Sequence, residues 1–149
     1  MNTVEIQHLD GSVVYDLRVS AFSLEDGLLN MDLKAEPNPS GPFAHMGAPT
    51  LYIEHATVDA SSLEGLVSQR LDVKTGWDTE EDEKEDNIFR IYINQHLALN
   101  DNQVTFSTQN GALVVDWSCT CQNMVWFKNP DNALRILCEI PQEFMNDIG

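Results

Sequence analysis

Short runs in which apolar and polar residues alternate recur along the whole chain, with turn-forming residues between them. The first run places Val4 and Ile6 on one side and Glu5 and Gln7 on the other. Alternation with a period of two is typical of half-buried β-strands. The pattern therefore predicts a protein built mainly of short β-strands.

The first forty residues are predicted to form a three-stranded meander. Asp10-Gly11 suits a two-residue turn, because both residues tolerate a positive φ angle. That turn would pair residues of one face: Val4 with Leu17, Ile6 with Tyr15 and His8 with Val13. Its weak point is that it sets Glu5 opposite Asp16.

The second turn of the meander contains Glu25-Asp26-Gly27. A two-residue loop would set Val19 opposite Lys34. A three-residue loop with Gly27 in the left-handed region instead sets Val19 opposite Leu33 and Ala21 opposite Met31. Apolar pairing favours the three-residue loop.

The strongest local signal is the Asn110-Gly111 dipeptide between two β-rich runs, which marks a hairpin with a type I′ turn. The register that follows makes one face continuously apolar. It pairs Val104 with Trp117, Phe106 with Val115 and Thr108 with Leu113.

Further strands are predicted at residues 51–58, 88–94 and 133–140, the last ending at Pro141. The stretch from Ser61 to Leu71 has helical spacing and a Ser61-x-x-Glu64 capping box, but Gly65 weakens a helix. The alternative of strand, loop and strand is slightly favoured. The Pro/Gly loop 37–49 and the acidic loop 78–86 interrupt the pattern as insertions.

About eight to ten short strands, with at most one or two short helices, predict an antiparallel β-sandwich or an open barrel. The chain has 149 residues, close to the common size of one domain, so residues 1–149 are expected to form a single β domain. The pattern does not decide between sandwich and barrel.

Charge is the outlying feature of the composition. Asp and Glu number 24 against 8 Lys and Arg, which gives a formal net charge of -16. Such a surface repels phosphate backbones and anionic lipids, so neither nucleic acid nor a membrane is an expected partner. A uniformly acidic proteome would give the same composition. No signal peptide or membrane span is recognisable, and the three cysteines are expected to be reduced thiols in a cytoplasmic protein.

Candidate metal and catalytic residues do not form a recognisable motif. Cys119 and Cys121 are too close for a zinc knuckle, and alternation from Ala112 places both on the core face of their strand. The four histidines are scattered along the chain. No nucleophile motif or cofactor-binding motif is present, so the sequence favours a protein that is not an enzyme and binds no metal or cofactor.

The candidate partner-binding residues are an acidic run and three aromatic residues that the core pattern does not absorb. The run departs from a calcium-binding EF-hand loop, because Glu83 stands where glycine is required. Tryptophan is enriched in binding hot spots. The predicted site comprises Asp78, Glu80, Glu81, Asp82, Glu83, Glu85, Asp86, Trp77, Trp126 and Phe127.

These observations predict an acidic protein-binding module that docks on a basic partner protein, such as an inhibitor of the immunity or antitoxin type. A ligand- or carbohydrate-binding β-module, with a cation in the acidic loop, is the alternative. A small hydrolase on a β-barrel is the second alternative. The prediction rests on charge and on the absence of other motifs.

Overall fold

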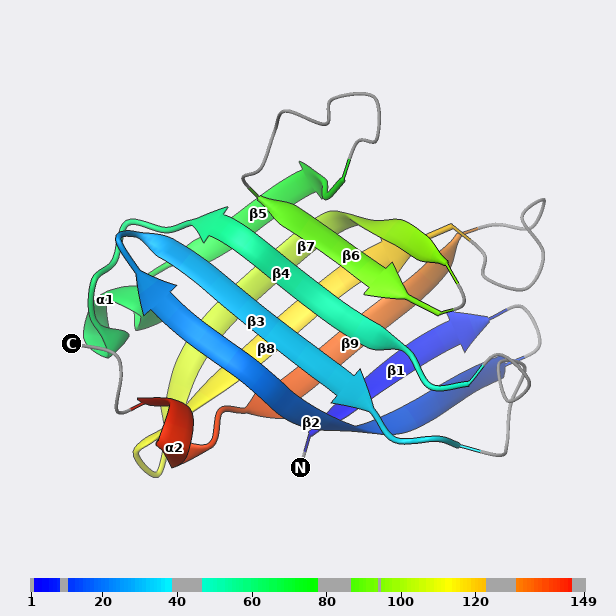
Figure 1. The fold of residues 1–149 in the computed structure, drawn as a ribbon, viewed down its shortest axis with the longest axis horizontal. Helices are drawn as coiled ribbons and strands as arrows, with labels where there is room; N and C mark the ends of the chain where they lie inside the picture. Colours follow the sequence, from blue (N-terminus) through cyan, green and yellow to red (C-terminus); the bar gives the residue numbers. More distant parts are fainter. Residues whose placement is uncertain are drawn as a thin grey trace.

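The computed structural model describes residues 2–8, 11–38, 47–77, 87–93, 95–122 and 131–145 (Figure 1). They form nine strands and two short helices. In chain order these are β1 Thr3–His8, β2 Gly11–Glu25, β3 Leu28–Ala35, β4 Thr50–Thr57, α1 Leu63–Val67, β5 Arg70–Thr75, β6 Ile88–Tyr92, β7 His96–Gln109, β8 Ala112–Cys121, β9 Asn132–Glu139 and α2 Gln142–Met145.

The strands form one antiparallel sheet that closes into a barrel. Strands that follow one another in the chain pair with each other, except that β5 and β6 share one position in the ring. β1 pairs with β9, which completes the ring. The mainly β, antiparallel class predicted from the sequence is confirmed. Of the two predicted architectures the barrel applies, and its ring is closed.

β5 and β6 occupy successive lengths of the same edge of β7. Thr75 of β5 lies opposite Asn100 of β7, and Arg90 of β6 lies opposite Ala98. Gly76 follows β5 and is packed so tightly between the two strands that an added Cβ would stand 2.1 Å from the Leu99 carbonyl oxygen and 2.4 Å from that of Phe89. The barrel therefore has eight strand positions, one of them filled by two segments.

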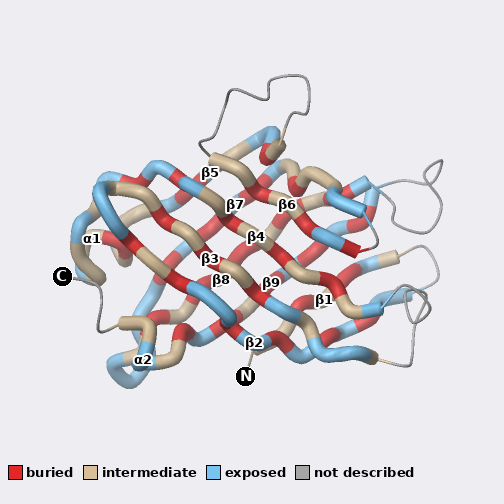
Figure 2. Tube along the Cα trace, viewed as in Figure 1, coloured by how far each residue is buried: buried red, intermediate tan, exposed pale blue. Residues whose placement is uncertain are grey.

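Apolar side chains fill the inside of the barrel. Figure 2 shows buried positions alternating with intermediate or exposed positions along most strands, as a wall with one dry and one wetter face requires. The largest fully buried side chains include Trp117, Tyr15, Phe89 and Met31. Cys119 and Cys121 are among the buried residues, which confirms that they face the core.

The β7–β8 hairpin is the best predicted part of the fold. Asn110 and Gly111 have φ angles of 53° and 83°, as a type I′ turn requires. The three predicted pairs, Val104 with Trp117, Phe106 with Val115 and Thr108 with Leu113, are all present.

The predicted register of β1 and β2 is wrong by two residues. The structure pairs Val4 with Tyr15, Ile6 with Val13 and His8 with Gly11. A shift of two keeps the same side chains inside the barrel, because the faces of a strand alternate. It also sets Glu5 opposite Val14 and so removes the contact between Glu5 and Asp16 that weakened the predicted register.

The predicted three-residue loop between β2 and β3 is also wrong. Glu25 pairs with Leu28, so the loop has two residues, and Asp26 and Gly27 have φ angles of 53° and 74°. Val19 still pairs with Leu33, because a β-bulge between Val19 and Ala21 absorbs the offset. Ala21 consequently lies opposite Asp32, where Met31 was expected.

Residues 61–71, for which strand, loop and strand was favoured, contain helix α1. Its N-cap is Ser62, one residue later than the capping box predicted, and the Ser62 side chain accepts a hydrogen bond of 3.2 Å from the Gly65 N–H. Leu66 is fully buried, so packing against the barrel end outweighs the weak helix propensity of Gly65. The other predicted strands agree with β4, β6 and β9 to within two residues.

Candidate interaction surfaces

Only one of the ten predicted partner-binding residues falls in the described part of the chain. Trp77 is half-buried, and its ring meets the His96 ring edge to face with centroids 6.2 Å apart. The other nine lie outside the described residues: Asp78, Glu80, Glu81, Asp82, Glu83, Glu85, Asp86, Trp126 and Phe127. Their part in binding stays a prediction.

A second group of carboxylates gathers at one end of the barrel. It comes from the turn between β2 and β3, the link from β4 to α1, α1 itself, the end of β9 and α2. All six side chains are exposed: Glu25, Asp26, Asp59, Glu64, Glu139 and Glu143. We call this group the acidic end (Figure 1, at the end that carries both helices).

Backbone hydrogen bonds hold the segments of the acidic end together. The Val58 N–H donates to the Gly27 carbonyl at 2.9 Å, which joins the link after β4 to the β2–β3 turn. The Ile140 N–H donates to the Leu113 carbonyl at 2.9 Å, and α2 packs against β2. The turn after β2 and the link after β4 are thus joined to each other, and the segment after β9 is held to β8 and β2.

No cation offsets these carboxylates within their own segments. Residues 25–28, 58–69, 109–112 and 139–145, which form the connections at this end, contain no Lys or Arg. Exposed charges act over about 8 Å at physiological ionic strength, so neighbouring carboxylates on one surface add their potentials. The acidic end is thus a negatively charged surface that the sequence analysis did not identify.

The described cations lie on the strands instead, chiefly on the side formed by β2 to β6. Arg18 of β2 is directly opposite Lys34 of β3. The others are Arg70, Lys74 and Arg90 on this side and Arg135 on β9. Most described cations therefore lie away from the acidic end, although Arg70 directly follows segment 58–69.

Arg90 is the centre of a polar cluster on the outside of the wall. Its Nε donates to Glu54 Oε1, another guanidinium N–H meets His96 Nδ1, and its Cζ lies 4.1 Å from the centre of the Tyr52 ring. The Tyr92 ring packs on His96 with centroids 4.6 Å apart. These contacts link β4, β6 and β7, and we call the cluster the brace.

The pKa of Asp32, beside this brace, is raised. Partial burial raises it most and the charge of Glu54 raises it further, while Arg90 and Lys34 lower it. Asp32 is half-buried on β3, opposite Tyr52. Acidic groups at the brace, Asp32 and Glu54, are thus accompanied by the basic groups Arg90 and Lys34. The segments of the acidic end contain no such basic groups.

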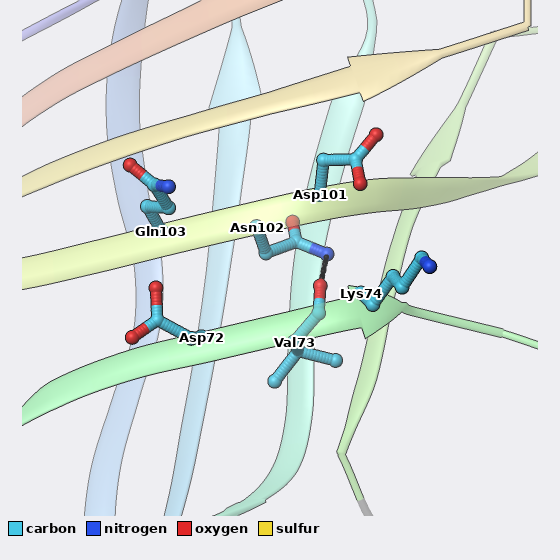
Figure 3. Close-up of a pocket in the computed structure, with 6 residues that line it drawn as sticks. All are labelled: Asp72, Val73, Lys74, Asp101, Asn102 and Gln103. Carbon is cyan, nitrogen blue, oxygen red and sulfur yellow. Dashed lines mark hydrogen bonds between the residues drawn. The ribbon is translucent and has the colours of Figure 1, made fainter.

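Two hollows border β5. A groove of about 500 Å³ runs along the strand and is lined by Thr57, the whole of β5 and Asn87. A smaller hollow of about 210 Å³ lies between β5 and β7, and Figure 3 shows its lining residues: Asp72, Val73, Lys74, Asp101, Asn102 and Gln103.

Asn102 at the smaller hollow is structural. It is 1% exposed, its Nδ2 donates to the carbonyls of Val73 and Leu99 at 3.0 and 2.6 Å, and its Oδ1 accepts from Trp117 Nε1 at 2.9 Å. A β-bulge between Asn100 and Gln103 turns the side chain inward. A single Asn in a polar stretch carries no sequence signal of this role.

The three cysteines are free and buried. Burial raises the pKa of Cys121 and of Cys138 to about 12, and it raises that of Cys119 as well. A thiolate is the nucleophile and the metal ligand, so these neutral thiols are unreactive core residues. In the part of the chain that the structure describes, no group of three His, Cys, Asp or Glu side chains is placed to hold a metal ion.

Neither of the two described helices is long and apolar enough to cross a membrane. In comparisons with known proteins, the chain matches no protein family, no curated protein and no solved structure.

Proposed function

We propose that this protein is an acidic protein-binding module that docks on a basic partner, as an inhibitor of the immunity or antitoxin type would. The observation that carries the proposal is the acidic end: six exposed carboxylates at one end of the barrel, with no Lys or Arg in the segments that present them. The acidic run 78–86, with Trp77, Trp126 and Phe127, stays a separate predicted binding surface.

The physical mechanism is electrostatic steering followed by short-range contact. A concentrated negative patch speeds encounter with a basic surface, and this effect weakens as salt is added. The barrel interior is filled by side chains such as Trp117 and Phe89, which favours binding on the outside of the barrel. Backbone hydrogen bonds hold the segments that carry the carboxylates, so little backbone entropy would be lost on docking.

The first experiment captures partners from the native cytosol on immobilised protein at about 50 mM and about 500 mM salt. The proposal expects basic proteins that are retained at low salt and released at high salt. A captured partner is then tested against the variant Glu25→Gln, Asp26→Asn, Asp59→Asn, Glu64→Gln. Asparagine suits position 26 because it tolerates the positive φ angle there.

The matched control removes four negative charges elsewhere, in the variant Glu5→Gln, Asp16→Asn, Glu36→Gln, Asp131→Asn. The two variants have equal net charge, so a general charge effect weakens both equally. Docking by the acidic end instead slows association of the first variant by at least about tenfold more than that of the control. Equal loss in both variants, or partners that are indifferent to salt, would refute the proposal.

A further inference from the structure

β5 uses only one of its two edges within the described structure. Its residues pair with Asn100 to Thr105 of β7 on one side. The other side faces the groove of about 500 Å³ described above. An unpaired strand edge is a template for a further strand, because it presents a row of backbone donors and acceptors.

The hydrogen bond to Asn102 shows which backbone groups face the groove. The Val73 carbonyl accepts from Asn102 of β7, and Figure 3 shows it pointing toward that strand. Successive residues of an antiparallel strand direct their N–H and C=O groups to opposite edges. The backbone groups of Arg70, Asp72 and Lys74 are therefore directed to the groove.

On the opposite wall of the groove, the N–H groups of Asn87 and Thr57 are both hydrogen-bonded. The Asn87 N–H donates to the His55 carbonyl at 2.8 Å, and the Asn87 side-chain oxygen accepts from the Thr57 N–H at 3.0 Å. Asn87 thus caps the end of β4 as a strand residue would. A strand entering the groove would pair with β5.

The exposed side chains on β5 alternate in charge. Arg70, Asp72 and Lys74 share the outer face, and Arg70 Nε lies 3.2 Å from Asp72 Oδ1. Opposite charges directly across an antiparallel pair stabilise it, and like charges destabilise it. A partner strand with the pattern acid-x-base-x-acid would set an opposite charge across from each of these three residues. The pattern is the same in both chain directions.

We propose that the groove accepts an extended segment of another protein, which adds to β5 as an antiparallel strand and sets an acid, a base and an acid opposite Arg70, Asp72 and Lys74. The groove volume lies in the usual range for ligand sites. The proposal does not depend on the acidic end, because the observations that support it come from β5 and its surroundings.

The test uses end-blocked, fluorescently labelled peptides and measures binding by anisotropy. The probe Thr-Glu-Val-Lys-Val-Glu-Thr carries the complementary pattern, and Thr-Lys-Val-Glu-Val-Lys-Thr carries the reversed one. We expect the complementary peptide to bind at least about tenfold more tightly. The comparison is demanding, because a protein of net charge -16 would by general attraction prefer the reversed peptide, whose net charge is positive.

Two further measurements separate strand addition from other binding. N-methylation of the central Lys of the peptide removes a donor that faces β5 and should abolish binding, whereas N-methylation of the Val before it should leave binding within about twofold. On binding, the amides of Asp72 and Lys74 should gain protection from hydrogen exchange. Leu71 and Val73, which face β7, should change little.

The variant Lys74→Glu gives the test on the protein side. It should weaken the complementary peptide by about tenfold, and replacing the peptide Glu opposite position 74 by Lys should restore binding. Failure of the complementary peptide to bind at millimolar concentration, equal effects of the two N-methylations, or pairing of this edge with a second copy in sedimentation measurements would each overturn the proposal.

Discussion

Two sides of the barrel are built differently. On one side, which we call the continuous wall, β8, β9 and β1 pair in order, and the β8–β9 ladder runs without a break from Val114 opposite Glu139 to Cys121 opposite Asn132. On the other side, the interrupted wall, β5 and β6 share one strand position, Gly76 lies at the break, and a groove follows the edge of β5.

The two walls differ in how much of their surface is buried. Side chains on the inner face of the continuous wall, Trp117 and Ile136 among them, are fully buried. β5, in contrast, exposes four of its six residues and, among the described residues, pairs only with β7. Regions of low local stability are where binding segments are usually found.

The largest expected effect comes from removing the main side chain of the continuous wall. Trp117 is fully buried, and its ring meets the Phe89 ring edge to face with centroids 5.8 Å apart. Its Nε1 also donates a hydrogen bond to Asn102 Oδ1. Trp117→Ala should lower the free energy of unfolding by about 3–5 kcal/mol. Val73→Ala on the interrupted wall should lower it by about 1 kcal/mol, because Val73 is only partly buried. Urea unfolding measures both, and similar losses would remove the contrast between the walls.

A smaller effect is expected at the break itself. Gly76→Ala would bring a Cβ within 2.1 Å of a backbone carbonyl oxygen, so β5 and β6 would have to move apart. Overpacking of this kind costs about 3 kcal/mol. The neighbouring variant Thr75→Ala, at an exposed position, should change stability by less than about 0.5 kcal/mol. A Gly76→Ala protein as stable as this control would show that the junction is not closely packed.

The smallest expected effect is a difference in the pH dependence of stability. Burial raises the pKa of Cys138 from an ordinary value of 9.0 to about 12. The unfolded chain therefore loses this proton first, and the contribution to stability is complete below pH 9 and is lost as the pH rises toward 12. Above pH 9 the free energy of unfolding should fall less steeply in Cys138→Ala than in the unchanged protein, by about 1.4 kcal/mol per pH unit. Chemical unfolding at pH 8, 9 and 10 measures the slope, and an unchanged slope would contradict the raised pKa.

The sequence predicted the fold best where one turn type left no alternative. Asn110-Gly111 fixed the β7–β8 register, because both residues readily adopt the positive φ angles that the turn needs. Asp26-Gly27 is an equally good turn, but the bulge after Val19 depends on tertiary packing and leaves no trace in the alternation. The helix at Leu63 was missed for a similar reason, since burial of Leu66 stabilises it.

The candidate surfaces could be predicted only in part. Runs such as 78–86 are visible because their charges are adjacent in the chain. The acidic end is assembled from separate connections, and only the order of strands in the ring brings the turn after Glu25 next to the link that carries Asp59. The position of β5 with one pairing partner among the described strands was equally hidden, because alternation of Arg70, Asp72 and Lys74 indicates a strand and says nothing of its neighbours.

Closure of the ring by β1 and β9 has a consequence for how the protein is made. During synthesis β1 leaves the ribosome first, but its second partner is the last strand to follow, more than 120 residues later. Until then β1 and β8 each lack a partner strand. Folding should therefore be completed after translation and be slow for a chain of this length, since such distant pairing raises the contact order. A chaperone that shields nascent strands would accordingly raise its yield.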